Sequence, residues 1–333
     1  MDAGANGSYD MLASVMWPAV EQRDTGVFAE LDYYYSDIDT LRLGLRYDRF
    51  TSEATDASRA AGVMGAARPS TLYQNFYGSD ETEMSSNEFG IVLGWDRQID
   101  AGKLLSVNLS RSARTPDASE NFIARSAGGT AWVGNPDINA EIHNQIDVTF
   151  MQRSDFLDWT ASAYWDEVSD YIDRYNVGSA TLYRNQDASI RGLELEASRD
   201  LGNYLSARAA VSYTRGEGDS GNLARISPLE GRVILDYTRS NWGLGAEIIA
   251  ADRQTRFNPF IDVAAETAGY SVLNVYGHWE AMENLTLELG VENLSDKAYA
   301  YHVNTAATDP FDPTAVRVNE PGRQFWMKLR YQL

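Results

Sequence analysis

The chain has no cysteine, only three histidines and few basic residues for its length of 333. Without cysteine it forms no disulfide and offers no thiolate ligand to a metal. Its 28 basic residues stand against 48 acidic ones, a formal net charge of −20, so no basic surface is strong enough to bind nucleic acid. No apolar run reaches the length of about 18 residues that a membrane-spanning helix needs, and the mean hydropathy is −0.39. Helical membrane spans are therefore excluded.

The chain does contain many short runs in which apolar and polar residues alternate. In Leu285–Glu292 every odd residue is aliphatic, and the even ones are Thr, Glu, Gly and Glu; residues 325–333 alternate in the same way. A period of two predicts a strand with one apolar face and one wet face. About fourteen such strands are expected, near residues 8–17, 26–35, 40–50, 87–97, 103–112, 143–153, 158–172, 182–199, 204–215, 229–239, 242–251, 270–280, 285–293 and 324–333.

The connections between these strands alternate in length. Short turns are expected at 36–39, 98–102, 154–157, 200–203, 240–241 and 281–284, and longer segments at 51–86, 113–142, 173–181, 216–228, 252–269 and 294–323. Short periplasmic turns and long external loops are typical of antiparallel β-barrels in an outer membrane. The polar face would then line a hydrated lumen. Candidate lumen-facing residues are Arg42, Arg46, Glu194, Glu196, Arg208, Glu288 and Lys328. A soluble β-sandwich shows the same alternation and stays an alternative.

Several segments, taken in order, resemble the TonB-dependent outer-membrane receptors. The stretch 290–299, followed by 320–326, is similar to the last hairpin of that family. Residues 110–117, 134–141 and 185–196 resemble three further family motifs. The hairpin residues that carry the resemblance are Asn293, Asp296, Lys297, Pro321, Gly322 and Arg323. Each is also explained by turn chemistry, since Pro fixes φ and Gly permits positive φ, so we expect these residues to shape the barrel without contacting cargo.

Within the family, the copper-receptor branch is the most similar. Residues 299–304, 316–323 and 226–232 resemble its sequence, which implies a copper ion or copper complex as cargo. Methionine and imidazole are ligands that copper favours, and His302 and Met64 both stand in expected long loops. No His-x-Met or Met-x-x-Met cluster accompanies them, so ordinary loop packing is the competing interpretation. A siderophore receptor of the same fold is an alternative.

Two features depart from the family pattern. Its members carry an N-terminal plug inside about 22 strands, whereas this chain shows no plug-like region and fewer strands. We therefore expect residues 1–333 to be the C-terminal part of such a barrel, without a second domain, with the TonB complex acting through a missing N-terminal plug. Residues 1–4 lack the start of a signal peptide, so we expect that a signal was removed or that the chain is the back part of a longer one. A self-closed passive channel is the rival interpretation.

The remaining expectations concern chemistry and location. No nucleophile elbow, P-loop or His-Glu-x-x-His motif is present, so we predict no enzyme activity and no cofactor. The expected location is the bacterial outer membrane, in contact with lipid and lipopolysaccharide. The cargo's chemical form and the oligomeric state are left open.

Overall fold

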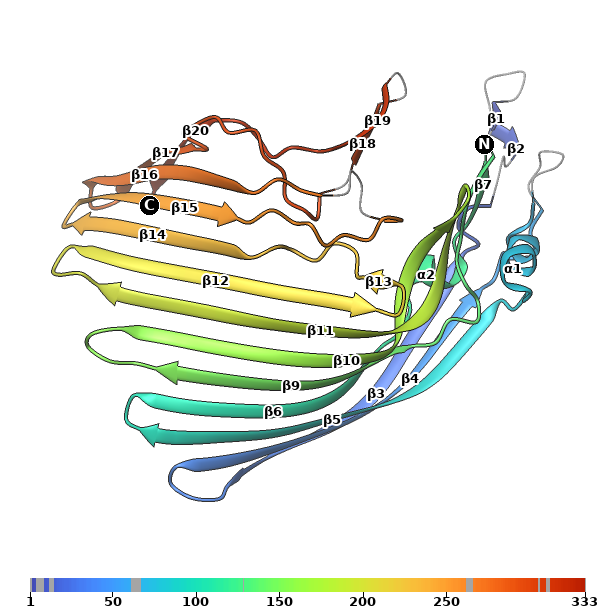
Figure 1. The fold of residues 1–333 in the computed structure, drawn as a ribbon, viewed down its shortest axis with the longest axis horizontal. Helices are drawn as coiled ribbons and strands as arrows, with labels where there is room; N and C mark the ends of the chain where they lie inside the picture. The colour runs from blue at the N-terminus through green and yellow to red at the C-terminus, as the bar shows by residue number, and fades with distance from the viewer. Residues whose placement is uncertain are drawn as a thin grey trace.

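In the described part of the chain, thirteen long strands follow one another across a single curved antiparallel sheet, which we call the wall (Figure 1). The computed structural model describes residues 2–3, 9–11, 15–60, 67–127, 129–261, 266–304, 306–309 and 312–332. The wall strands are β3 (Val20–Tyr34), β4 (Asp39–Ala54), β5 (Glu83–Asp100), β6 (Lys103–Arg114), β9 (Glu141–Gln152), β10 (Asp158–Val177), β11 (Ala180–Asp200), β12 (Leu205–Gly218), β14 (Glu230–Arg239), β15 (Trp242–Ala251), β16 (Tyr270–Met282), β17 (Leu285–Glu292) and β20 (Gln324–Tyr331).

The smaller elements gather at the end of the wall where the long connections lie (Figure 1). Among the residues described, three short strands extend the same sheet, two hairpin pairs stand apart from it, and two helices occupy the loops. These elements are β7 (Ala124–Ala127), β8 (Thr130–Val133), β13 (Gly221–Asn222), β1 (Asp2–Ala3), β2 (Tyr9–Met11), β18 (Ala306–Asp309), β19 (Asp312–Arg317), α1 (Pro69–Tyr77) and α2 (Ala118–Phe122). Neither helix has the length and apolar character needed to cross a membrane.

Strand register separates the wall into an apolar face and a polar face. Leu287 lies opposite Leu329, and their neighbours Glu288 and Lys328 lie opposite each other on the other face. Leu289 is 48% exposed and Leu329 63% exposed, so no other described part of the chain covers the apolar face at these strands. A soluble sandwich would bury these side chains. The expected transmembrane β-barrel wall is therefore confirmed, and the sandwich is not what the chain forms.

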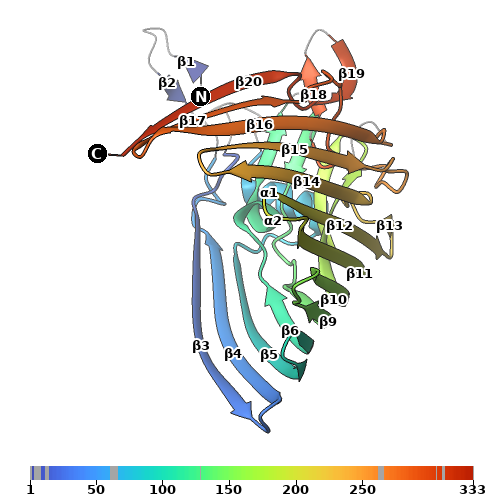
Figure 2. The ribbon, with the colours of Figure 1, turned by 90° about the vertical axis from the view of Figure 1, so that its left-hand side faces the viewer.

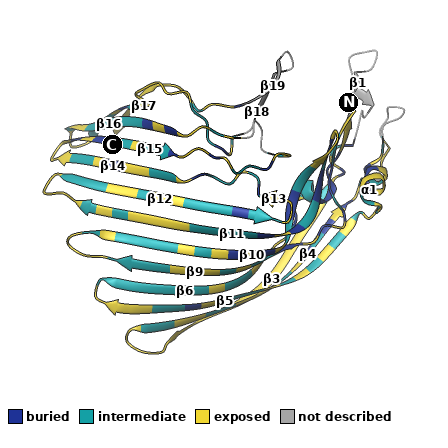
Figure 3. Ribbon diagram, in the orientation of Figure 1, coloured by how far each residue is buried: buried dark blue, intermediate teal, exposed yellow. Residues whose placement is uncertain are grey.

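Buried residues concentrate at the loop end of the wall instead (Figure 3). Tyr73 of α1 and Phe122 of α2 are fully buried there, in one cluster with Val133 and Leu182. Pro69 begins α1, where a missing N–H costs nothing, and Gly78 ends it with a φ of 76° that suits glycine. We call this region of helices, short strands and strand ends the loop-end layer.

Two sequence predictions about strands were wrong. The described residues of the expected strand 8–17 are not part of the wall. Tyr9–Met11 pairs with β1. Residues 15–18 enter the loop-end layer, where the Met16 carbonyl accepts a hydrogen bond from the Ala124 amide. Residues 4–8 and 12–14 lie outside the described part. The expected long loop 173–181 is a tight hairpin instead, because β10 and β11 stay paired up to Val177 and Ala180.

The wall is open along its two outermost strands. β3 and β20 end the strand order and, among the described residues, do not pair with each other. Figure 2 shows them at opposite sides of the trough that the sheet forms. All eight residues of β20 are exposed, as are fourteen of the fifteen in β3.

Candidate functional site

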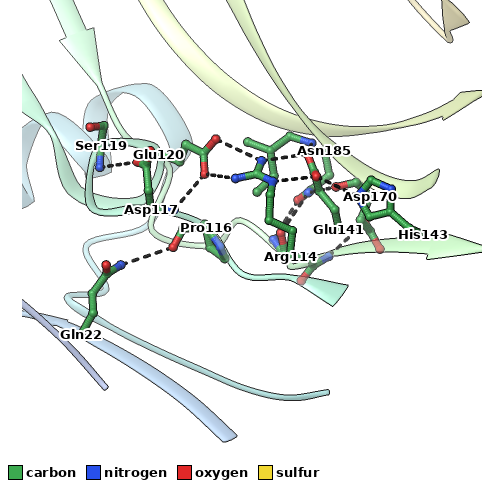
Figure 4. Close-up of polar contacts among 12 residues, drawn as sticks. Gln22, Arg114, Pro116, Asp117, Ser119, Glu120, Glu141, His143, Asp170 and Asn185 are labelled. Carbon is green, nitrogen blue, oxygen red and sulfur yellow. Dashed lines mark hydrogen bonds and ion pairs between the residues drawn. The ribbon is translucent and has the colours of Figure 1, made fainter. Parts of the chain in front are cut away.

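The short helix α2 is fixed at the loop end of the wall by its own N-terminal residues. The Asp117 side chain accepts hydrogen bonds from the amides of Ser119 (2.7 Å) and Glu120 (2.8 Å). The Glu120 carboxylate accepts in return from the Asp117 amide at 2.8 Å, which completes a capping box. Pro116 supplies a carbonyl to Gln22 of β3, so the helix start is also tied to the edge of the wall (Figure 4).

Arg114, the last residue of β6, joins this helix to the next strand. Its Nε and Nη2 donate to the two oxygens of Glu141 at 2.7 and 2.8 Å, and its Nη1 donates to Glu120 at 2.9 Å. Glu141 is only 3% exposed and also accepts from the Ile172 amide at 2.7 Å. One guanidinium therefore holds α2, β6 and β9 together, and the carboxylate extends the contact to β10 (Figure 4).

The environment of Glu141 keeps it ionised. It is the outermost residue of β9, beyond the roughly 9–11 residues with which a strand crosses a bilayer. Burial, the largest single influence, raises its pKa, but hydrogen bonds from Arg114, His143 and the Ile172 amide outweigh burial and lower the pKa to about 2. The buried charge is thus fully compensated by its partners.

His143 extends the network into the polar face. Its Nδ1 lies 2.7 Å from Asp166 on β10, and its Nε2 lies 3.2 Å from Glu141. Sequence reasoning did not select His143 or Asp166, because their contact depends on the pairing of β9 with β10. The shared strand face of Glu141 and His143, two residues apart, was the one available signal.

The middle family motifs meet in this same place. The Asn185 side chain accepts from the Asn139 amide at 2.8 Å and donates to the Asp170 carbonyl at 2.6 Å. Gly134 lies so close to the backbone of Asn121 that an added Cβ would stand 2.5 Å from it. Segments that are far apart in sequence thus meet through hydrogen bonds at the loop end of the wall and position the external connections there.

The predicted lumen residues all lie on the polar face, and most are ion-paired. Arg42 lies 3.3 Å from Asp32 and 3.4 Å from Asp96, and Arg208 lies 2.8 Å from Asp236. Further pairs join Arg46 to Asp48 (2.6 Å) and Lys328 to Glu288 (3.3 Å). Glu196 lines a hollow of about 340 Å³ with Arg208, and Glu194 lies opposite Ser162 and Ser212. That water reaches these side chains in a closed barrel stays a prediction.

The C-terminal motif braces the exit from β17. Asn293, with a φ of 50°, accepts from the Lys297 amide and donates to the Lys297 carbonyl, both at 2.8 Å. It also donates to the Pro321 carbonyl at 3.3 Å. Asp296 accepts from the Arg323 amide at 2.8 Å, and an added Cβ on Gly322 would meet this carboxylate at 2.8 Å. These contacts fit the expected shaping role.

Of the two predicted metal ligands, the structure describes only His302. His302 is 3% exposed, and its Nδ1 lies 2.7 Å from the Thr267 hydroxyl. Met64 lies outside the described residues. Within the described ranges no group of three or more His, Cys, Asp or Glu side chains is arranged to hold a metal ion. The assignment of His302 and Met64 as ligands stays a prediction.

Comparison with known proteins places this wall in a family. The model of the TonB-dependent receptor-like β-barrel matches residues 2–294. The copper transporter OprC is 28% identical, with a TM-score of 0.81 over 94% of this chain and 48% of its own. The FrpB iron transporter of Neisseria meningitidis (F3-3 variant) is 17% identical, with a TM-score of 0.68 over 94% and 45%. The ferric-catecholate import receptor Fiu of E. coli K12 is 14% identical, with a TM-score of 0.69 over 94% and 45%.

The chain thus spans about half the length of these solved relatives. The matched family and the solved relatives are receptors and transporters rather than enzymes. The family match covers well over half of the chain, and the fold, the open polar face and the order of motifs agree with it. The chain belongs to the TonB-dependent receptors of the bacterial outer membrane, through their β-barrel.

Proposed function

We propose that this protein takes up a metal ion or metal chelate across the outer membrane and that its cargo is copper. The observation that carries the proposal is the similarity to the copper transporter OprC. Its identity of 28% and TM-score of 0.81 exceed those of the FrpB and Fiu iron receptors, which are 14–18% identical with TM-scores of 0.67–0.69. The C-terminal motifs that resemble the copper branch support the same cargo.

The wall contributes two properties to such uptake. Its acidic excess, a net charge of −20, attracts cations toward the protein. Its polar face offers ion-paired side chains that a hydrated cargo passes without meeting an apolar surface. In this proposal the energy comes from the TonB complex acting on a plug, and lipopolysaccharide surrounds the outer rim.

The cargo is tested by isothermal titration calorimetry of the full-length receptor with copper(I), copper(II) and ferric enterobactin. Saturable copper binding without ferric-chelate binding is the expected result. Binding of the ferric chelate alone would overturn the copper assignment and favour a siderophore receptor of the same fold. A His302→Ala variant tests the ligand prediction: a ligand role lowers copper affinity, whereas a packing role leaves it unchanged.

A further inference from the structure

An arginine–aromatic cluster stands at the short-turn end of the wall, on the apolar face. The guanidinium of Arg239 lies 4.2 Å from the ring centre of Tyr204, and its Nε donates to the Tyr237 hydroxyl at 3.0 Å. Tyr237 in turn contacts the rings of Tyr204 and Trp242, with centroid separations of 6.1 and 5.5 Å. These contacts hold the guanidinium against the aromatic rings and use only its Nε as a hydrogen-bond donor among the described residues.

Arg199 repeats the arrangement two strands away. Its guanidinium lies 3.6 Å from the ring centre of Phe156, an exposed residue of the neighbouring turn. β12 separates β11, which carries Arg199, from β14, which carries Arg239. Arg199 lies opposite Ala207, which lies opposite Leu235, so Arg239 is two strands away and four residues further along its strand. At about 4.8 Å per strand and about 3.4 Å per residue, the Cα atoms of the two arginines are roughly 17 Å apart.

Neither arginine is neutralised, although the chain is strongly acidic. Among the described residues, no ion pair joins Arg199 or Arg239 to a carboxylate, whereas Arg208 on the polar face is paired. Strand alternation directs Asp200, the neighbour of Arg199, to the polar face. Asp236 also lies there, bound to Arg208 and to the Tyr276 hydroxyl. Asp200 and Asp236 are therefore turned away from the two guanidinium groups.

Apolar side chains continue from this cluster toward the middle of the wall. Leu244 and Leu235 are exposed on the same face, next to Trp242 and Tyr237. Short turns in this family face the periplasm, and the periplasmic leaflet of the outer membrane consists of phospholipid. A fixed planar guanidinium above an apolar surface matches a phosphodiester headgroup whose acyl chains lie along that surface.

We propose that Arg199 and Arg239 bind the phosphate of anionic phospholipids in the periplasmic leaflet, with Phe156, Tyr204, Tyr237 and Trp242 holding the two guanidinium groups in place. The site anchors the short-turn rim at a fixed depth in the membrane. It is independent of the transported cargo.

Native mass spectrometry of the full-length protein, released from dodecyl maltoside micelles, tests the proposal. The micelles contain either phosphatidylglycerol or diacylglycerol with the same acyl chains, and inorganic phosphate is a third probe. We expect the protein to retain phosphatidylglycerol. We expect the double variant Arg199→Gln/Arg239→Gln to bind it about tenfold more weakly, from the loss of charge-assisted hydrogen bonds.

Arg97 provides a matched control. It lies 6.0 Å from the ring centre of Trp95 at the same end of the wall, but Asp39 neutralises it at 3.8 Å. Arg97→Gln is therefore expected to leave phosphatidylglycerol binding unchanged. If the double variant does not fold, Arg239→Lys, which keeps the charge and loses the planar fork, is expected to give an intermediate loss.

Three results would overturn the proposal. Equal retention of phosphatidylglycerol by the wild type and the double variant Arg199→Gln/Arg239→Gln would show that these arginines are not the site. Equal retention of diacylglycerol would show that acyl packing alone holds the lipid. Binding of inorganic phosphate as strong as that of the lipid would make the cluster a general anion site.

Discussion

Replacing Glu141 by alanine removes the centre of the polar network at the loop end. The change deletes two hydrogen bonds from Arg114 and leaves the buried Ile172 amide without its acceptor. Breaking a buried charge pair costs about 3–5 kcal/mol, and an orphaned buried amide about 1–3 kcal/mol. In the variant Arg114 keeps its ion pair with Glu120 and is partly exposed, so we expect a loss of stability at the lower end of the charge-pair range, about 3 kcal/mol. Glu141→Gln keeps an acceptor for the amide and should cost about half as much.

Hydrogen exchange at the Ile172 amide measures this cost where it arises. A loss of about 3 kcal/mol lowers the protection factor of that amide roughly 100-fold. Glu217→Ala is the matched control, because Glu217 also pairs with arginine, at Arg215 and Arg191, but its side chain is 45% exposed. An exposed pair of this kind contributes less than about 1 kcal/mol. If Glu141→Ala lowers protection no more than Glu217→Ala, the network does not hold the loop end together.

The same carboxylate predicts a pH dependence. The pKa of Glu141 is about 2 in the folded protein against an ordinary value of 4.5. A lowered pKa means that the contribution to stability is complete above about pH 4.5 and is lost as the pH falls toward 2. Protection of the Ile172 amide, corrected for intrinsic exchange, should therefore decline over this interval. It should not decline in Glu141→Gln, and an identical decline in both would refute the assignment to this group.

Two further predictions test the wall itself. Gly290→Ala should lower the free energy of unfolding in urea by about 1–3 kcal/mol, because the added Cβ would stand 2.3 Å from the Trp326 ring. Gly44→Ala should be near neutral, because no atom lies nearer than 3.5 Å to its added Cβ. Equal urea midpoints for the two variants would contradict the strand register. Because the chain has no cysteine, Glu288→Cys should react quickly with a water-soluble maleimide and Leu289→Cys slowly, and equal rates would contradict a wall with water on one side and lipid on the other.

The wall was predictable because the alternation of a strand is a local property. Leu285–Glu292 coincides with its expected strand to within one residue. The strand expected at 8–17 failed because alternation does not distinguish a strand in the wall from a segment that enters the loop-end layer. There, Ala19 has a φ of 54° and the Asp56 amide donates to Pro18. Only the long-range contacts of the folded chain settle such a case.

The site was predictable only as separate motifs. The capping box of α2 is visible in sequence as Asp117 followed three residues later by Glu120. The meeting of Arg114 with Glu141 was not, because β9 lies beside β6 only after the whole segment between them has folded into the loop-end layer. The contact of His143 with Asp166 required the same register information. Motif residues were therefore found, and their shared network was not.

The direction of the edge strands separates the two interpretations of the wall. Thirteen strands that alternate in direction leave β3 and β20 running the same way, both toward the short turns. A self-closed channel would therefore need a parallel pair between them, and the structure does not make that pair. Closing the wall with antiparallel pairs alone takes an odd number of further strands. A barrel of about 22 strands would add about nine strands to these thirteen, which is an odd number. Because unpaired edges are not tolerated in lipid, the direction of β3 and β20 favours the receptor over the self-closed channel.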